Sequence, residues 1–148
     1  QGITPLSEFK PARNTYEIDA TFEITDPKAK FGIKTVVNGD HGVSVGYDAN
    51  TATLFLDRTN SENARFSGRF AKYMTAPLAP QNGKVRLHIF VDQSSIEVFA
   101  NDGVVTMSAL MFPSPNSLGT ELFSEGGETN LQSLRAWELD SIWGVPAE

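Results

Sequence analysis

The stretch VRLHIFVDQSSIEVFANDG, residues 85–103, decides the fold. It reads as two strands joined by a tight turn at Gln93-Ser94, with a second turn signal at Asn101-Asp102-Gly103. Partners across such a hairpin point to the same side of the sheet. One side is then a core face, formed by Val85, Leu87, Ile89, Val91, Ile96, Val98 and Ala100. The other side is mixed, formed by Arg86, His88, Phe90, Asp92, Ser95, Glu97 and Phe99.

Length and composition describe one globular domain, residues 1–148, with 40% hydrophobic and 20% charged residues. The net charge of −6 disfavours nucleic acid and anionic membranes, since both attract basic surfaces. The chain has no cysteine, which excludes disulfides and thiolate chemistry, and no apolar run long enough to span a membrane. Because it begins at Gln1 rather than Met, we expect a fragment or a mature product.

The rest of the chain repeats the pattern of short strands between turns. Residues 1–14 are predicted to be irregular, because Pro5 and Pro11 limit regular structure. The long stretch 57–83 is either a functional loop or hides a short strand around Tyr73. Further strands are predicted at 15–24, 31–37, 43–47, 53–56, 104–112, 118–124 and 131–139. About nine strands without a helical stripe predict an all-β protein, a two-sheet antiparallel β-sandwich that is jelly-roll-like.

Metal sites find little support in the residue pattern. His41 and His88 are far apart and lack a neighbouring ligand pattern, which disfavours zinc. Calcium at Asp26, Asn38 and Asp40 stays open, but the spacing matches no known loop and solvated turn residues are the simpler interpretation. No cofactor is predicted.

Catalysis by this chain alone is not predicted. A nucleophile elbow is absent from the sequence, and a glycoside hydrolase needs two carboxyls across a cleft. Asp92 and Glu97 share a predicted sheet face, which more often supplies a binding surface.

The mixed face of the hairpin contains the residue types that bind neutral sugars. Carboxylates and arginine hydrogen-bond to hydroxyls, and aromatic rings pack on the C–H side of the sugar. Arg86, Asp92, Glu97, Phe90 and Phe99 supply these types. The alternative is a second small core, with the two phenylalanines under residues 57–83 and Arg86 paired with Glu97 across the strands.

Several motifs resemble one family. The main motifs are Leu54-Phe55-Leu56-Asp57-Arg58 and Val91-Asp92-Gln93-Ser94-Ser95-Ile96-Glu97-Val98-Phe99, accompanied by Tyr47-Asp48, Ser61 and the 101–103 turn. They look like the C-terminal β-sandwich lobe of glycoside hydrolase family 32, which includes invertases, levanases and inulinases. LRAWELDSIW, residues 134–143, is similar to the closing segment of that lobe, so the resemblance covers nearly the whole chain.

The resemblance implies a lobe without its catalytic partner. The propeller motifs of that family (Asn-Asp-Pro-Asn-like, Arg-Asp-Pro and Glu-Cys) do not occur in this sequence. The chain therefore resembles either the structural lobe or a free-standing module descended from it, and fructan-binding carbohydrate-binding modules of the levanase type are similar to the second description.

Two departures from the family pattern favour a changed role. Gln93 stands where the family usually has Arg, and the segment after Arg58, NSENARFSGRF, also differs. In the binding interpretation Gln93 and Ser94 shape the rim of the site, and Tyr73 or Phe123 packs on the sugar ring. The hydroxyls are then held by Asp57, Arg58, Asp92 and Glu97. The alternative is that these last four residues brace loops through buried ion pairs.

We therefore predict a secreted, monomeric, non-catalytic carbohydrate-binding module. It recognises terminal fructose of fructans such as levan, as polysaccharide or oligosaccharide, and targets an attached fructan hydrolase to its substrate. The alternative is a structural β-sandwich lobe that stabilises a family 32 propeller without binding sugar.

Overall fold

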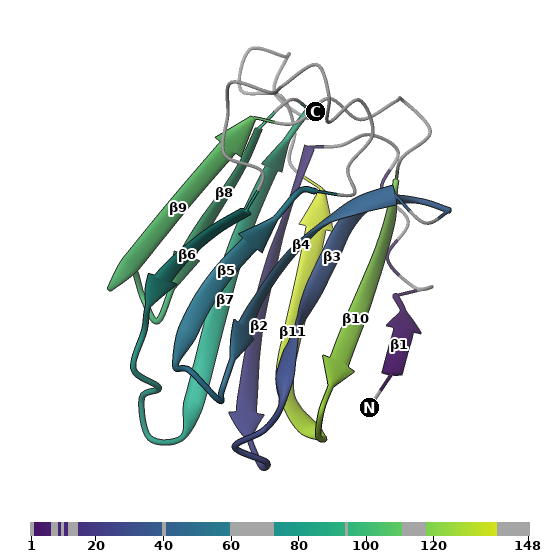
Figure 1. Cartoon of the computed structure of the whole chain (residues 1–148). Coiled ribbons are helices and arrows are strands. Elements are labelled where there is room, and N and C mark those ends of the chain that lie inside the picture. The colour runs from purple at the N-terminus through teal and green to yellow at the C-terminus, as the bar shows by residue number, and fades with distance from the viewer. Residues whose placement is uncertain are drawn as a thin grey trace.

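A computed structural model describes residues 2–6, 9, 11, 15–39, 41–59, 73–93, 95–110 and 118–138. This part of the chain is all-β (Figure 1) and holds no helix long and apolar enough to cross a membrane. Its strands are β1 (Gly2–Pro5), β2 (Thr15–Ile24), β3 (Lys30–Asn38), β4 (His41–Asp48), β5 (Thr53–Asp57), β6 (Tyr73–Pro77), β7 (Lys84–Asp92), β8 (Ser95–Ala100), β9 (Val105–Leu110), β10 (Gly119–Glu125) and β11 (Thr129–Glu138).

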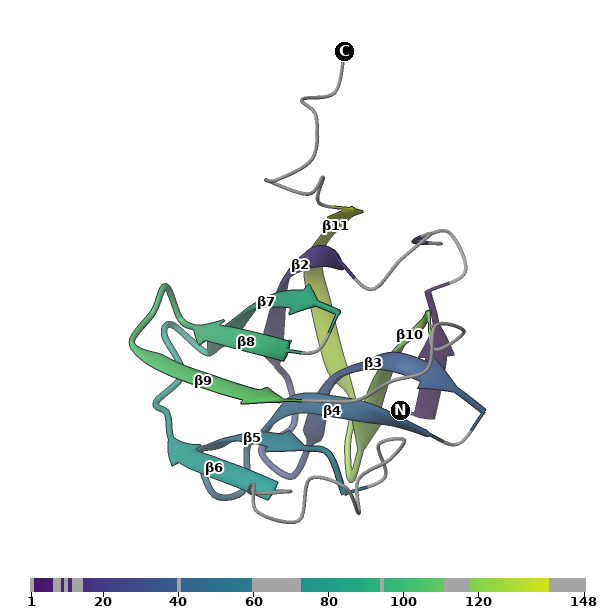
Figure 2. The ribbon, with the colours of Figure 1, turned by 90° about the horizontal axis from the view of Figure 1, so that it is seen from above.

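The strands form two antiparallel sheets that pack face to face, as the view from above shows (Figure 2). The six-stranded sheet has the order β1-β10-β3-β4-β5-β6, and the five-stranded sheet has the order β11-β2-β7-β8-β9. The predicted two-sheet antiparallel β-sandwich is therefore confirmed. Alternation along each strand sends apolar side chains inward, where they form one core between the sheets.

The hairpin that the sequence singled out has the predicted register. Asp92 pairs with Ser95, Phe90 with Glu97, and the intervening partners follow. Gln93 adopts a positive φ of 47° in the loop, as tight hairpin turns require. The predicted core face is confirmed, since each of its members is 0% exposed: Val85, Leu87, Ile89, Val91, Ile96, Val98 and Ala100.

The predictions for residues 1–14 and for the stretch 57–83 have different outcomes. The expectation that residues 1–14 are irregular is wrong for Gly2–Pro5, which forms β1 as an edge strand on β10. An edge strand tolerates proline because one of its sides makes no ladder hydrogen bonds. The short strand expected around Tyr73 is confirmed as β6, which pairs with β5. Residues 60–72 lie outside the described part.

The turn after β8 is held by one buried side chain. Asn101 is 2% exposed and has a φ of 49°. Its Oδ1 accepts the backbone N–H of Arg86 at 2.8 Å, and its Nδ2 donates to the carbonyl of Ala79 at 3.0 Å. The side chain thus joins β7, the β8–β9 turn and the segment after β6.

We expect Asn101→Ala to lower the free energy of unfolding by about 2 kcal/mol, because two hydrogen bonds are lost and a half-buried N–H is left unsatisfied. Gln93→Ala is the matched control, since Gln93 has a similar positive φ but is exposed. It should change stability by less than about 0.5 kcal/mol. Urea denaturation of both variants measures the difference, and equal midpoints would contradict the role of the Asn101 side chain.

Candidate functional site

The outer face of the six-stranded sheet contains an open hollow of about 400 Å³, which we call the Phe55 hollow. Strand register explains its position, because Phe123, Gly32, Gly46 and Phe55 lie in one row across β10, β3, β4 and β5. The two glycines in the middle of this row have no side chain, so the rings of Phe55 and Phe123 can lie over the backbone at Gly46. The hollow is lined by Gly2, Ile3, Lys30, Lys34, Ser44, Phe55, Asp57, Glu121, Phe123, Ser124 and Glu125.

Aromatic rings form the apolar part of the Phe55 hollow. The ring centroids of Phe55 and Phe123 are 6.3 Å apart, and Tyr73 stacks on Phe55 at 6.1 Å with an interplanar angle of 16°. The ammonium of Lys30 lies 4.9 Å from the centroid of Phe55, within cation–π range. Phe55 is only 2% exposed beneath these neighbours, whereas Tyr73 is 48% exposed at the side.

The glycines of this row leave no room for a side chain. A Cβ on Gly46 would lie 2.3 Å from the carbonyl oxygen of Phe31 and 2.7 Å from the Phe55 ring. A Cβ on Gly32 would lie 2.1 Å from the carbonyl oxygen of Val45. All three distances are far below van der Waals contact, so the close approach of backbone and ring depends on glycine.

Charged and polar groups surround the aromatic rings. Glu121, Lys34, Ser44 and Asp57 form a second row beside the first, and Tyr73 ends it on β6. The Oδ1 atom of Asp57 accepts hydrogen bonds from the backbone N–H of Thr59 at 2.9 Å and from its hydroxyl at 2.6 Å. These bonds hold the carboxylate and use only one of its oxygens. The lining includes two lysines and three carboxylates, so its charges nearly cancel.

The structure brings together three of the residues selected from the sequence. Asp57 and Phe123 line the Phe55 hollow, and Tyr73 stacks on its central ring. Sequence reasoning missed Lys30, Lys34, Ser44, Phe55 and Glu121. Alternation along β3 could have placed the two lysines on the outer face, but their neighbours follow only from the order of strands in the sheet.

The other selected residues lie elsewhere. Arg58 is 1% exposed, and burial lowers the pKa of its guanidinium. Asp92 and Gln93 are exposed at the end of β7 in the five-stranded sheet. Glu97 is exposed on the outer face of that same sheet. The outer faces of the two sheets point in opposite directions, so Glu97 and Asp57 cannot contact the same sugar unit. Ser94 lies outside the described residues.

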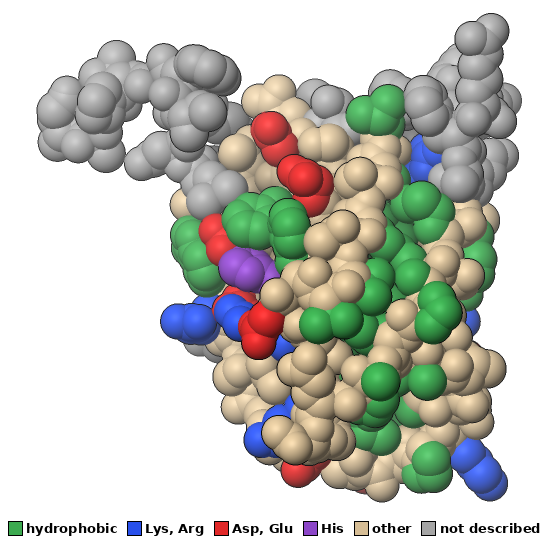
Figure 3. All heavy atoms as spheres, turned by 90° about the vertical axis from the view of Figure 1, so that its left-hand side faces the viewer, with side chains coloured by type: hydrophobic (Ala, Val, Ile, Leu, Met, Phe, Trp, Pro, Cys, Tyr) green, Lys and Arg blue, Asp and Glu red, His purple; other side chains and the backbone are tan. Residues whose placement is uncertain are grey.

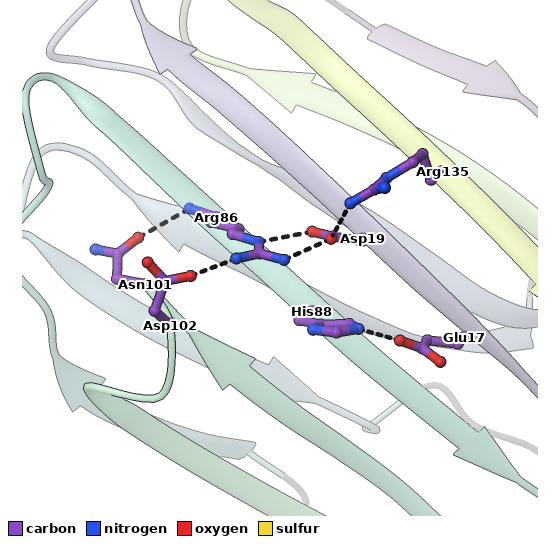
Figure 4. A network of polar contacts seen from close by, with 7 residues as sticks. All are labelled: Glu17, Asp19, Arg86, His88, Asn101, Asp102 and Arg135. Carbon is purple, nitrogen blue, oxygen red and sulfur yellow. Dashed lines mark hydrogen bonds and ion pairs between the residues drawn. The ribbon is translucent and has the colours of Figure 1, made fainter.

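The outer face of the five-stranded sheet carries a network of ion pairs (Figure 4). Asp19 is 5% exposed and accepts hydrogen bonds from Arg86, from Nε at 2.8 Å and from Nη2 at 2.6 Å. Arg135 adds a third bond to Asp19 at 3.1 Å, and Arg86 also pairs with Asp102. The pair of Arg86 with Glu97, which the second-core alternative implied, does not form, because the register places Phe90 opposite Glu97.

The network shifts the pKa values of Asp19 and Arg86. The hydrogen bonds from Arg86 hold the pKa of Asp19 below its ordinary value, although burial acts in the opposite direction. The same bonds raise the pKa of Arg86. Next to them, His88 pairs with Glu17 on β2. The whole cluster joins β11, β2, β7 and the β8–β9 turn.

The described residues contain no group of three or more His, Cys, Asp or Glu side chains that could hold a metal ion. Asp26 accepts the backbone N–H of Lys28 at 2.9 Å, as an ordinary turn residue does. Asp40, the third residue of the calcium alternative, lies outside the described part.

Comparison with known proteins agrees with this geometry. The family model described as "Glycosyl hydrolases family 32 C terminal" matches residues 2–138. A levanase from Bacillus subtilis strain 168 is 41% identical over 134 residues, which are 89% of this chain and 20% of the levanase. An extracellular exo-inulinase from Aspergillus ficuum is 36% identical over 132 residues, which are 87% of this chain and 25% of the inulinase.

A solved structure extends the comparison to three dimensions. The crystal structure of exo-inulinase from Aspergillus awamori superposes with a TM-score of 0.82 at 34% identity, covering 97% of this chain and 28% of that chain. The chain therefore spans about a fifth to a quarter of the curated relatives named above, 20% of the levanase and 25% of the inulinase. The resemblance inferred from the motifs is confirmed: the chain belongs to the C-terminal domain family of the family 32 glycosyl hydrolases.

Proposed function

We propose that the chain is one non-catalytic module, residues 1–148, that binds the terminal fructosyl unit of fructans such as levan. It directs an attached, secreted fructan hydrolase to that polymer. The observation that carries the proposal is the Phe55 hollow, where aromatic rings and hydrogen-bonding groups share one concave surface. The names of the relatives, a levanase and extracellular exo-inulinases, support fructan as the polymer and an extracellular location.

Each part of the hollow has a task in this proposal. The rings of Phe123 and Tyr73 pack on the C–H groups of the sugar, and the buried Phe55 ring supports both of them from below. The carboxylate of Asp57 accepts hydrogen bonds from the sugar hydroxyls, and Lys30 donates hydrogen bonds to hydroxyl oxygens from its position beside Phe55. Asp57 is already held by Thr59, so less side-chain entropy is lost when the sugar binds.

The charge of the hollow favours a neutral ligand over an ionic one. Two lysines and three carboxylates line it, so neither an anion nor a cation gains a strong net attraction. A fructosyl unit is uncharged and carries many hydroxyls. With about 12 heavy atoms at roughly 0.4 kcal/mol each, one unit would bind with about −5 kcal/mol, a dissociation constant near 0.2 mM.

We expect Asp57→Ala to weaken binding of levan oligosaccharides by about tenfold or more, because a charged acceptor of hydroxyl protons is lost. Glu97→Ala is the matched control, a carboxylate on the outer face of the other sheet. It should change this affinity by less than about twofold. Isothermal titration calorimetry with levan oligosaccharides and inulin measures both.

Two outcomes would contradict the proposal. The first is the absence of heat when the wild-type chain is titrated with levan, levan oligosaccharides and inulin. The second is full retention of affinity in Asp57→Ala with loss in Glu97→Ala, which would move the site to the five-stranded sheet. Asp92→Ala tests whether the sugar binds at the end of β7 instead of on either outer face. The proposal expects this variant to bind levan oligosaccharides with wild-type affinity.

The second candidate function is a structural lobe that stabilises a catalytic propeller. Val104 and Leu110 favour it. Val104 precedes the edge strand β9 and is 66% exposed, and Leu110 is the last residue of β9 and is 41% exposed. Exposed apolar side chains on an edge strand are typical of surfaces that pack against another domain. The candidate requires that joining the chain to its parent propeller raises its melting temperature, and an unchanged melting temperature would rule it out.

A further inference from the structure

A second hollow lies on the outer face of the five-stranded sheet. It has a volume of about 450 Å³, and we call it the Phe90 hollow. Figure 3 views the molecule from the edge where β9 and β6 lie in Figure 1, and shows hydrophobic side chains beside a histidine and a cluster of acidic and basic groups. The hollow is lined by Arg86, His88, Phe90, Phe99, Asp102 and Gly103. It faces away from the Phe55 hollow, because the two are on the outer faces of opposite sheets.

Three rings form a continuous apolar surface in the Phe90 hollow. His88 stacks on Phe90 with centroids 4.7 Å apart, and Phe99 meets Phe90 edge-on at 5.6 Å. All three side chains are half-buried, so part of each ring remains open to solvent. Residues 57–83 were the alternative cover for these rings; of this stretch, Tyr73–Pro77 forms β6, which pairs with β5 in the other sheet, and residues 60–72 lie outside the described part.

The polar rim of this hollow is held in place before any ligand arrives. Arg86 is fixed by both oxygens of Asp19 and by Asp102, and His88 is fixed by Glu17. Side chains that are already ordered lose little conformational entropy on binding, which favours affinity. The side chain of Asp102 is 67% exposed, so its carboxylate can still accept hydrogen bonds from hydroxyl groups.

The charges at the rim select against ions. The guanidinium of Arg86 is balanced by two carboxylates, so an incoming anion would compete with partners that are already in place. A cation would lie against that same guanidinium. A ligand with an apolar C–H face and several hydroxyls uses both the rings and the exposed carboxylate. A neutral saccharide has this chemistry.

We propose that the Phe90 hollow is a second saccharide-binding site, which makes the domain bivalent. The inference rests on the proposed function, because the ligand is a unit of the same fructan. Two sites on opposite faces cannot share one short oligosaccharide, but they can engage two chain ends of a branched or entangled polymer. Binding at one site then raises the effective concentration of polymer at the other.

The test is an NMR titration of the ¹⁵N-labelled 148-residue chain with short levan oligosaccharides. Amide signals of Phe99 and Gly103 report on the Phe90 hollow, and those of Gly46 and Phe123 report on the Phe55 hollow. We expect both groups to shift in the wild type. Phe90→Leu keeps apolar volume but removes the flat ring. It should weaken the affinity reported by the signals of Phe99 and Gly103 by about tenfold or more.

The two proposals fail in different ways. If Phe99 and Gly103 do not shift in the wild type, or if they shift equally in Phe90→Leu, the second site does not exist. If the signals of Phe99 and Gly103 shift but those of Gly46 and Phe123 do not, the Phe55 hollow does not bind sugar. The proposed function then loses the site on which it rests, while the second site is retained. Asp57→Ala is the reciprocal control and must leave the response of Phe99 and Gly103 intact. The dispersed spectrum of each variant verifies its fold.

Discussion

Asp19→Ala is expected to lower the free energy of unfolding by about 3 kcal/mol, because it breaks a buried ion pair. The carboxylate is 5% exposed and accepts three hydrogen bonds from two arginines. Its removal leaves Arg86 with one remaining carboxylate, Asp102, and removes the side-chain hydrogen bonds that join β2 to β7 and β11. The side chain of Arg86 is 37% exposed and can bind water, which keeps the loss of stability near the lower end of the range for buried pairs.

Asp102→Ala is the matched control for that variant. Asp102 pairs with the same guanidinium but is 67% exposed at its side chain. An exposed pair contributes at most about 1 kcal/mol, because water and salt screen it. Guanidinium chloride denaturation of the two variants therefore separates burial from mere pairing. Equal losses of stability would contradict the central place of Asp19.

The same residue makes stability depend on pH. The folded-state pKa of Asp19 lies below its ordinary value of 3.8, chiefly because Arg86 donates to it. A depressed folded-state pKa means that the stabilisation is fully present above the unfolded-state pKa and is lost as the pH falls through the folded-state pKa. Acidification below about pH 4 should therefore destabilise the wild type more steeply than Asp19→Asn. Parallel acid-unfolding curves would show that Asp19 does not contribute.

Gly46→Ala is expected to lower the free energy of unfolding by about 2 to 3 kcal/mol, as overpacking does, and to weaken sugar binding in the Phe55 hollow. The new Cβ would lie 2.3 Å from a backbone carbonyl oxygen, which cannot rotate away. It would also displace the Phe55 ring, which lies 2.7 Å from that position. Strand β4 is central in its sheet, so the strain cannot be relieved at an edge.

Thermal unfolding and levan-oligosaccharide calorimetry measure the two effects of Gly46→Ala. Ser44→Ala is the control for stability, because it lies on the same strand and face and removes atoms instead of adding them. We expect it to change the free energy of unfolding by less than about 1 kcal/mol. A Gly46→Ala variant with wild-type stability and affinity would refute the requirement for glycine.

Local periodicity predicted the strands well because it reports directly which face of a strand is buried. Thr15–Ile24 was predicted to the residue, and the 85–103 hairpin was predicted with its register. The alternation in β1 is too short to read, so Gly2–Pro5 was missed. Its pairing with β10 joins segments more than a hundred residues apart, and no local pattern encodes that contact.

The candidate site was harder to predict than the fold. Motif resemblance selected Asp57 and Glu97 together, although they lie on the outer faces of opposite sheets. The second-core alternative paired Arg86 with Glu97, whereas its partners are Asp19, which lies 67 positions earlier on β2, and Asp102 in the β8–β9 turn. Which strands become neighbours in a sheet, and therefore which side chains meet, depends on strand order, and periodicity does not contain that information.

By itself, the sequence determined that this protein is a β-sandwich, since short amphipathic strands can bury their apolar faces only by pairing two sheets. It also determined the family, through the motifs around Asp57 and Asp92. Only the tertiary structure decided which polar residues meet. Strand order places Phe123, Gly32, Gly46 and Phe55 in one row and so creates a hollow whose members are scattered along the chain.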